Sequence, residues 1–255
     1  MITKRELQDF AQMKKLNLGN AEKDYLIDLA LWSISKNIKN ELVFKGGTCL
    51  YKFYKLGRFS EDIDFSAVRN IDVNSLMNSL ILDLERLGVK SVIHTKKEPY
   101  NSVLITLRVE GPLYAGKPTT YANIGIDINM KSQVHVEPEL LSYRSVYPEV
   151  TTVSALCMKK EEIFAEKIRA IMTRKRARDL FDLHFLIENG VHCSEELIRK
   201  KMEYYDQKFE VGKLVKNLKD LENKWERELK GFTTALPTFK AVQDKVLHKL
   251  IEVYT

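Results

Sequence analysis

The segment FKGGTCLYKFYKLGRFSEDIDF, residues 44–65, contains the two patterns on which the fold of this chain depends. Gly46 and Gly47 follow a β-like run, and glycine permits a tight turn in which backbone N–H groups can approach a phosphate closely. Asp62 and Asp64 are separated by one isoleucine. Side chains alternate along a strand, so the two aspartates project from one face while the isoleucine points into the core. The segment therefore predicts a phosphate-binding turn followed by a strand with paired carboxylates.

The paired carboxylates favour a divalent metal ion. Two hard oxygen ligands a few ångströms apart suit Mg²⁺ (or Mn²⁺), which keeps waters and substrate phosphates as its other ligands. Either pattern alone is weak, because most Gly-Gly pairs are simple turns and alternating charge is common on solvated strand edges. Glycines first, then a short amphipathic run, then Asp-x-Asp is a more specific order. It indicates a site that handles nucleotides.

The composition indicates a globular protein with a basic lean. With 255 residues and 44% hydrophobic content, the chain can bury one large core or two modest ones. It has 41 basic and 35 acidic residues, and this net charge of +6 favours an anionic partner such as a nucleotide or a nucleic acid. No apolar stretch approaches the roughly 20 residues that span a bilayer, and the N-terminus lacks a secretory signal. We therefore expect a cytoplasmic protein without a membrane partner.

Cysteine and histidine usage excludes the common zinc and disulfide frameworks. Cys49, Cys157 and Cys193 are odd in number and far apart, and no C-x-x-C pair occurs. The five histidines show no H-x-x-x-H spacing. We expect reduced cysteines and no zinc.

The sequence pattern predicts both helices and strands in the first 130 residues. Asn20 is expected to cap a helix that begins at Ala21, within a helical region of residues 1–40. Asn74 is expected to cap a helix that ends at Gly88. Further expected elements are strands at 91–94, 102–109 and 124–130, and a loop or hairpin at 111–123.

Asp127 is a candidate third carboxylate. It lies in the run IGIDINM between Ile126 and Ile128. If both isoleucines face the core, Asp127 points to the opposite side of the sheet. The alternative is an ordinary, partly exposed strand aspartate.

The C-terminal part of the chain is predicted to be helical. Residues 131–152 contain Pro138 and Pro148, and we expect them to be irregular and to mark a boundary. The pattern becomes helical from Ser154, with helices at 154–173 and 178–188 and three further charged helices from Glu195. The sequence thus predicts two domains, residues 1–150 with the sheet and a helical domain of residues 151–255.

A second charged cluster lies in EEIFAEKIRAIMTRKRARDLFDL, residues 161–183. Lys167 and Arg174 are two helical turns apart and share a face. Charge-rich helix faces are most often simply solvated. Asp179 and Asp182, however, stand among apolar positions, and buried charges are costly unless they are paired. We therefore expect these two aspartates to be buried or paired.

Both segments resemble one known family. The glycines followed by Asp-x-Asp resemble the signature of polymerase β-type nucleotidyltransferases. More narrowly, KGGTCLYK…RFSEDIDF resembles the AbiEii-type nucleotidyltransferases, which are toxins of type IV toxin–antitoxin systems, and their MenT-type relatives. The second segment resembles the C-terminal motifs of the same family, a helix of the type K-x-x-A-x-x-x-R followed by R-D-L-x-D-L. The resemblance covers about residues 20–190, and it implies an α+β fold with a mixed sheet, flanking helices and a C-terminal helical domain that completes the active-site cleft.

The resemblance also implies roles for individual residues. Metal ligation and catalysis fall to Asp62, Asp64 and Asp127, the last of which could also accept the proton of the attacking hydroxyl. Further catalytic roles fall to Lys167, which would reach the triphosphate, and to Asp182. Nucleotide-binding roles fall to Lys45, Gly46, Gly47, Thr48, Arg58, Ser60, Arg174, Arg178 and Asp179. For Asp182 a purely structural salt bridge between domains is an open alternative.

The implied activity is a metal-dependent transfer of a nucleoside monophosphate from an NTP to an RNA acceptor, with the 3′ end of tRNA favoured. A cognate antitoxin is an implied partner. Two alternatives stay open at this point: a nucleotide- or RNA-binding module without activity of its own, and a transferase or kinase that modifies a protein side chain.

Overall fold

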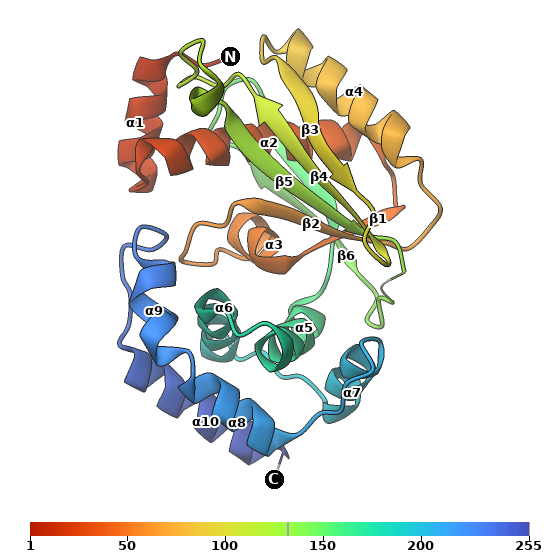
Figure 1. Cartoon of the computed structure of the whole chain (residues 1–255), viewed down its shortest axis with the longest axis vertical. Helices are drawn as coiled ribbons and strands as arrows, with labels where there is room; N and C mark the ends of the chain where they lie inside the picture. The colour runs from red at the N-terminus through yellow and green to blue at the C-terminus, as the bar shows by residue number, and fades with distance from the viewer. Residues whose placement is uncertain (132, 255) are drawn as a thin grey trace. The chain divides into compact units, whose positions relative to one another are not determined.

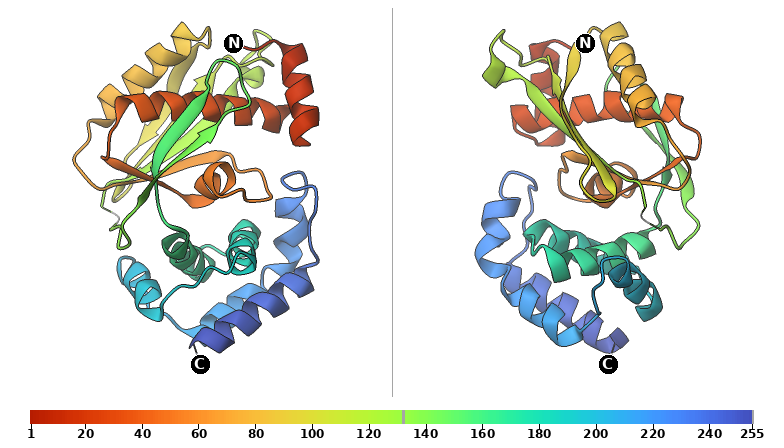
Figure 2. Two further views of the ribbon diagram at one scale, coloured as in Figure 1. Left: turned by 180° about the vertical axis from the view of Figure 1, so that it is seen from behind. Right: turned by 45° about the vertical axis from the view of Figure 1, so that its right-hand side comes forward.

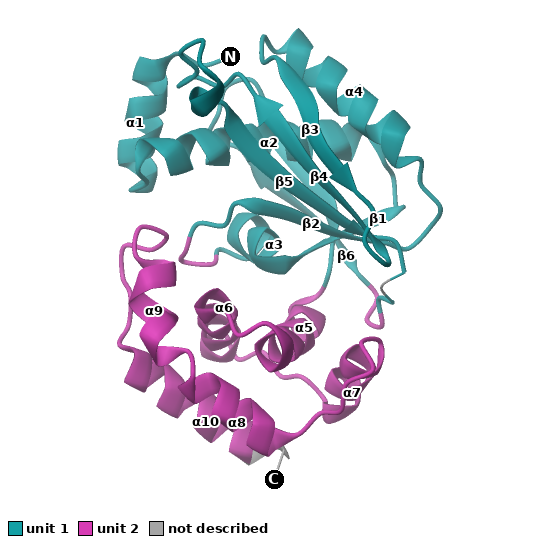
Figure 3. Cartoon of the chain, in the orientation of Figure 1, with its two compact units in different colours: residues 1–55, 59–134, 138–158 teal, residues 56–58, 135–137, 159–255 magenta. Residues whose placement is uncertain are grey.

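The computed structural model describes residues 1–131 and 133–254, which form two compact units (Figure 3). The sheet unit comprises Met1–Lys55, Phe59–Val134 and Pro138–Met158. The helical unit comprises Leu56–Arg58, His135–Glu137 and Lys159–Thr255. The connection between helix α3 (Gly46–Phe53) and strand β2 (Asp62–Ala67) therefore contributes three residues to the helical unit, although it lies early in the chain.

A mixed sheet forms the centre of the sheet unit. Its strands are β1 (Leu42–Lys45), β2 (Asp62–Ala67), β3 (Ser91–Lys97), β4 (Ser102–Val109), β5 (Ala122–Asn129), β6 (Glu139–Arg144) and β7 (Thr152–Cys157). Their spatial order is β3-β4-β5-β2-β1-β7-β6. The pairs β2/β5 and β1/β7 are parallel, and the other neighbours are antiparallel. In β5 the apolar residues Ile124, Ile126 and Ile128 are buried, so one face of this strand packs into the core.

The helices of the sheet unit are α1 (Lys4–Lys14), α2 (Leu18–Asn37), α3 (Gly46–Phe53) and α4 (Val73–Arg86), with a short 3₁₀ turn η1 (Pro118–Thr120). Helix α2 crosses behind the sheet in Figure 1 and contacts β5, β7 and α4. Ser33 of α2 donates a hydrogen bond of 2.9 Å to Asp83 of α4, which joins the two helices. The 20-residue α2 is buried on several sides, including at Asp24 and Asp28.

Both expected N-caps are wrong by two or three residues. Helix α2 begins at Leu18, and the cap is Asn17, whose side chain accepts a hydrogen bond from the backbone N–H of Asn20. Helix α4 begins at Val73 after Asp72. Asn and Asp are equally good caps, so a run that contains several of them does not identify the capping one.

The segment expected to be irregular contains a strand. Residues 131–152 include β6, and β7 occupies Thr152–Cys157, where a helix was expected from Ser154. The next helix starts at Lys160. A six-residue segment of mixed apolar and hydroxyl side chains is compatible with either a helix or a strand when read alone, and the pairing of β7 with β1 and β6 decides for the strand.

The helical unit contains α5 (Lys160–Thr173), α6 (Ala177–Glu188), α7 (Glu195–Glu203), α8 (Val211–Lys219), α9 (Glu222–Leu229) and α10 (Phe239–Tyr254). In the described part of the chain, four helices rather than the expected three follow Ser194. Helices α8 and α10 run side by side in Figures 1 and 2. No described helix is both long and apolar enough to cross a membrane.

Candidate active site

Three aspartates project from one face of the sheet. Asp64 of β2 and Asp127 of β5 are Cα partners in the parallel ladder, and Asp62 stands opposite Gly125. Residues that pair across neighbouring strands point to the same side. The buried Ile63 points to the other side, as the alternation predicts. The sequence-based expectation that Asp62, Asp64 and Asp127 share a face is confirmed.

Two glycines leave room at these carboxylates. Gly46 has φ +76°, and a Cβ added there would lie 2.4 Å from Oδ2 of Asp64. A Cβ added at Gly125 would lie 3.0 Å from Oδ1 of Asp62. Side-chain atoms essentially never approach as closely as the Cβ at position 46 would, so that position requires glycine while Asp64 stays in place. At position 125 the contact would be tight, and the Asp62 carboxylate would have to shift by a few tenths of an ångström. The glycines therefore serve the geometry of the aspartates as well as the backbone turn.

The N-terminus of α3 lies next to this carboxylate face. The capping residue is Lys45, which is the Cα partner of Asp64 in the antiparallel β1/β2 ladder. No side chain caps the helix, so the N–H groups of its first turn, which include those of Gly46 and Gly47, are not satisfied by a capping side chain. Uncapped N–H groups at a helix N-terminus suit an anion such as a phosphate.

Thr48 and Ser60 have structural surroundings. The buried Thr48 hydroxyl donates a hydrogen bond to the backbone carbonyl of Asp62, and so ties α3 to β2. The hydroxyl proton of Thr48 is thus donated within the protein, and the expected phosphate-binding role of Thr48 stays a prediction. Ser60 is buried in the α3–β2 connection.

A buried ion-pair network anchors the other end of α3, and the sequence did not reveal it. Nζ of Lys52 pairs with Asp28 and lies 2.7 Å from Oδ1 of Asp24, and all three side chains are at most 4% exposed. Lys14 also pairs with Asp24. The carboxylates accept further hydrogen bonds from Tyr143, Ser145 and Tyr147.

Charge pairing sets the ionisation of this network. Burial alone would raise the pKa of Asp24, but Lys52 and Lys14 outweigh it and hold the pKa well below its usual range. Both ends of α3 are thus fixed, by Thr48 near its start and by Lys52 near its end. The only sequence signal was a pair of aspartates four residues apart in a helix with little polar face.

The second charged cluster forms a continuous chain of ion pairs inside the helical unit. Arg58 donates two hydrogen bonds of 2.7 Å to Asp182, one to each carboxylate oxygen. Nζ of Lys167 lies 2.6 Å from Asp182 and 3.0 Å from Asp179. Arg174 donates to both oxygens of Asp179. The expectation that the two aspartates are buried and paired is confirmed, since they are at most 1% exposed.

The residues of this ion-pair cluster differ in their access to solvent. The side chains of Arg58 and Lys167 are 3% and 7% exposed, whereas that of Arg174 is 58% exposed. Burial opposes ionisation of Asp179, but Lys167 and Arg174 more than compensate and hold its pKa well below its usual range. Arg58, expected to bind nucleotide, donates two of its guanidinium N–H groups to Asp182, and its nucleotide-binding role stays a prediction. The catalytic roles of Lys167 and Asp182 stay predictions.

Arg178, the other expected phosphate ligand, lies near an aromatic ring. Its guanidinium carbon is 5.1 Å from the ring centre of Phe232, which is cation–π distance.

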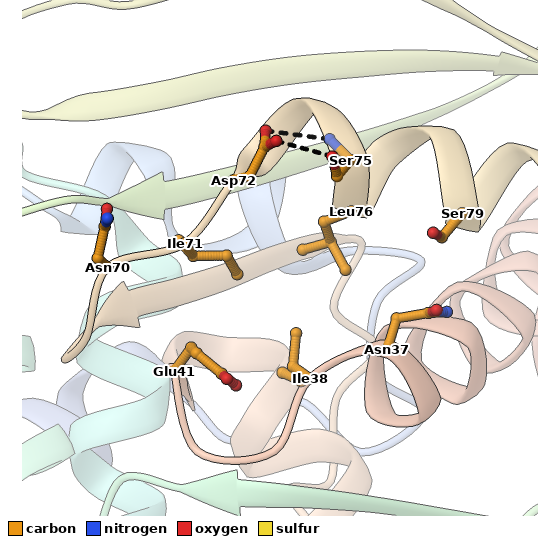
Figure 4. A pocket seen from close by; sticks show the side chains of 9 residues that line it. All are labelled: Asn37, Ile38, Glu41, Asn70, Ile71, Asp72, Ser75, Leu76 and Ser79. Carbon is orange, nitrogen blue, oxygen red and sulfur yellow. Dashed lines mark hydrogen bonds between the residues drawn. The ribbon is translucent and has the colours of Figure 1, made fainter.

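A polar pocket of about 230 Å³ lies elsewhere in the sheet unit (Figure 4). It is lined by Asn37, Ile38, Glu41, Asn70, Ile71, Asp72, Ser75, Leu76 and Ser79. Its two carboxylates serve the backbone: Glu41 accepts from the N–H groups of Lys39 and Asn40, and Asp72 caps α4. Asp62, Asp64 and Asp127 do not line this pocket, and we assign it no part in the chemistry.

The aspartate face fits a divalent ion held jointly with a substrate. Within residues 1–131 and 133–254, no three His, Cys, Asp or Glu side chains converge into a group that could enclose a metal ion. Mg²⁺ is usually held by one or two carboxylates together with waters and substrate phosphates, rather than by a cage of protein ligands. Hard carboxylate oxygens beside a helix N-terminus that suits phosphate provide that combination.

A mixed sheet with paired aspartates beside a glycine-opened helix is the arrangement expected from the resemblance to nucleotidyltransferases. The model of the family described as "Nucleotidyl transferase AbiEii toxin, Type IV TA system" matches residues 31–246. The chain belongs to this family of nucleotidyltransferase toxins of type IV toxin–antitoxin systems, and the predicted enzyme class is confirmed.

Solved structures confirm the predicted fold class. MenT4, a nucleotidyltransferase toxin from Mycobacterium tuberculosis H37Rv, is similar with a TM-score of 0.65 and 18% identity, over 98% of this chain and 88% of MenT4. JHP933 from Helicobacter pylori is similar with a TM-score of 0.58 and 20% identity, over 94% of this chain and 93% of JHP933. A comparison with curated proteins found no match.

Proposed function

We propose that the protein transfers a nucleoside monophosphate from an NTP to an RNA, in a reaction that requires Mg²⁺ or Mn²⁺, with the 3′ end of tRNA as the favoured acceptor. The observation that carries the proposal is the register of β2 and β5, which puts Asp64 and Asp127 side by side next to the uncapped start of α3. The net charge of +6 supports a polyanionic acceptor.

Two groups of residues in the sheet unit have separate roles in the proposed reaction. Asp62, Asp64 and Asp127 are the carboxylates that would hold the metal ion together with substrate phosphates, and the ion would neutralise charge on the triphosphate and lower the pKa of the acceptor hydroxyl. The N–H groups of Gly46 and Gly47 bind phosphate oxygens.

The acceptor oxygen attacks the α-phosphorus, and the bond from that phosphorus to the bridging oxygen of the β-phosphate breaks. Pyrophosphate leaves, and Asp127 takes the proton of the acceptor hydroxyl. Positioning and charge neutralisation supply most of the acceleration. A reaction of this kind uses cytoplasmic NTP and RNA, and an antitoxin is its expected regulatory partner.

An acceptor screen tests the proposal. Purified protein is incubated with total tRNA, Mg²⁺ and each of the four α-labelled NTPs separately, with and without a cell-protein fraction. We expect label on RNA with a preferred nucleotide and none after chelation by EDTA. Label on protein alone would refute the RNA acceptor and leave the metal site standing. Absence of any label, with nucleotide binding intact, would refute the transferase reaction for the isolated chain.

A further inference from the structure

Two tyrosine rings lie against each other in a tilted arrangement next to the start of β5, the strand that carries Asp127. The ring centres of Tyr114 and Tyr121 are 4.7 Å apart with an interplanar angle of 32°, and their hydroxyls are 3.3 Å apart. Both side chains are half-buried. The guanidinium carbon of Arg108 lies over the Tyr121 ring, 6.0 Å from its centre. We call these three residues the tyrosine platform.

The platform lies on the carboxylate face of the sheet. Tyr121 has an extended backbone (φ −65°, ψ 136°) and directly precedes β5. The two-residue alternation therefore puts its side chain on the same side as Asn123, Gly125 and Asp127. The β4 register agrees, because Arg108 is the Cα partner of Asn123 and its side chain reaches the Tyr121 ring.

The loop that carries Tyr114 is held in place by hydrogen bonds. The buried side chain of Glu22 in α2 accepts a hydrogen bond of 2.6 Å from the N–H of Leu113. The N–H of Ala115 donates to the hydroxyl of Thr120 at 3.0 Å, and that hydroxyl donates to the carbonyl of Lys117. A stack held this way costs little entropy to order when a ligand binds.

The platform has the chemistry of a single-stranded nucleic-acid site. Unpaired bases stack on tyrosine rings regardless of sequence, and arginine adds a charge for the phosphates. Lys117 is exposed in the same loop and adds a second cation. The bases of a duplex are already stacked on one another, so an unpaired segment is the natural occupant.

The distance along β5 between the tyrosine platform and the carboxylates limits how many nucleotides of RNA could lie between them. Tyr121 and Asp127 are six residues apart on an extended strand, which is about 20 Å at about 3.3 Å per residue. Stacked nucleotides rise by about 3.4 Å each and extended, unstacked nucleotides advance further, so at most about six nucleotides span that distance.

We propose that the tyrosine platform binds an unpaired segment of the acceptor RNA a few nucleotides upstream of its reacting 3′ end, and so aligns that end with Asp64 and Asp127. This inference rests on the proposed RNA acceptor. It adds a substrate-binding subsite that contains no catalytic residue.

Binding of a fluorescein-labelled ten-nucleotide single-stranded RNA tests the platform without requiring transfer. The variants are Tyr114→Ala/Tyr121→Ala, which removes the stack, and Tyr114→Phe/Tyr121→Phe, which keeps the rings without the hydroxyls. Tyr205→Ala is the matched control, because Tyr205 is also paired with a tyrosine and an arginine, Tyr204 and Arg169, but on the helical unit. The unfolding temperature of each variant verifies that it is folded.

We expect the double alanine variant to bind the RNA at least about tenfold more weakly, within the range that base–aromatic stacking gives. The double phenylalanine variant and Tyr205→Ala should bind as the unchanged protein does. In transfer assays the alanine variant should raise KM for tRNA and leave KM for the NTP unchanged. Unchanged RNA affinity in the alanine variant, or an equal loss in the phenylalanine variant, would overturn the platform.

The binding assay separates this inference from the proposed function. RNA affinity that depends on the tyrosines, in a protein that transfers no label to RNA, would support the platform and refute the acceptor assignment. Transfer to RNA with an unchanged KM for tRNA in the alanine variant would refute the platform alone.

Discussion

Asp64 and Asp127 are direct neighbours across the parallel strands β2 and β5, although 63 residues separate them along the chain. A shift of one residue in this register would send one of them to the opposite face of the sheet. Ile63, Ile126 and Ile128, all buried, hold the register because the shift would also expose them. The core packing of these strands thus positions the candidate metal ligands.

Replacement of Gly46 by alanine is expected to displace Asp64. The new Cβ would lie 2.4 Å from the carboxylate, at a backbone φ of +76° that alanine adopts only at a cost of about 1–2 kcal/mol. A displacement of about 1 Å at a reacting centre can cost about 100-fold in rate, so we expect transfer to fall by at least that factor. Single-turnover kinetics measure it.

Gly212→Ala is the matched control for that substitution. Gly212 lies in α8 with no heavy atom within 4 Å of an added Cβ and no positive φ. We expect unchanged transfer and equal or slightly higher stability. Equal activity losses in the two variants would mean that the fit between Gly46 and Asp64 does not matter.

Asp182→Asn is expected to destabilise the helical unit. The amide would leave the buried charges of Arg58 and Lys167 without the carboxylate that joins them. Removal of one partner of a buried ion pair costs about 3–5 kcal/mol. Urea unfolding followed by circular dichroism measures the change, and Arg174→Ala is the comparison, because this half-exposed partner of Asp179 should contribute about 1 kcal/mol or less. A folded, fully stable Asp182→Asn that has lost transfer would instead assign Asp182 to the chemistry.

Lys52→Met tests the network at the end of α3. The variant would strand Asp24 and Asp28 in the protein interior, at an expected cost of about 3–5 kcal/mol. Lys23→Met removes a neighbouring lysine whose ion pair with Glu61 is partly exposed, and it should cost about 1 kcal/mol or less. Similar unfolding free energies for the two variants would show that burial of the Lys52 network adds nothing to stability.

The protein should lose stability in acid. The folded-state pKa of Asp179 lies below its ordinary value of 3.8, as does that of Asp24. The unfolded chain therefore binds these protons more readily, and the stabilisation is complete above 3.8 and is lost as the pH falls below it. Urea unfolding between about pH 5 and about pH 3 should show this decline. Asp179→Asn should give a shallower slope, and an identical slope would exclude Asp179 as a cause.

Local patterns were sufficient for the carboxylate face. The apolar neighbours of Asp64 (Ile63 and Phe65) and of Asp127 (Ile126 and Ile128) define the inward side of each strand, so the orientation of both aspartates follows from alternation. The alternation does not give the pairing of β2 with β5, which joins residues far apart in the chain and was expected only from the family resemblance.

Contacts that depend on distant partners could not be predicted from the sequence. Asp24 and Asp28 were not singled out from the sequence, because their partner Lys52 lies 24 to 28 residues further on. Arg58, next to the Asp-x-Asp strand in sequence, pairs with Asp182, which is 124 residues away. Strand β6 was missed because its outward residues, such as Leu140, remain exposed at a sheet edge and give no clear alternation.

The metal-assisted role of the paired aspartates is tested most directly by Asp64→Asn, which keeps the shape of the side chain and removes its charge. Transfer of labelled nucleotide to RNA is measured under single-turnover conditions in Mg²⁺, with Asp244→Asn, at an exposed position of α10, as the control. Metal charge stabilisation amounts to several kcal/mol, so we expect transfer to fall by at least about 100-fold while the circular dichroism spectrum is unchanged. Near-normal transfer by a folded Asp64→Asn would contradict the assignment of this carboxylate face as the active site.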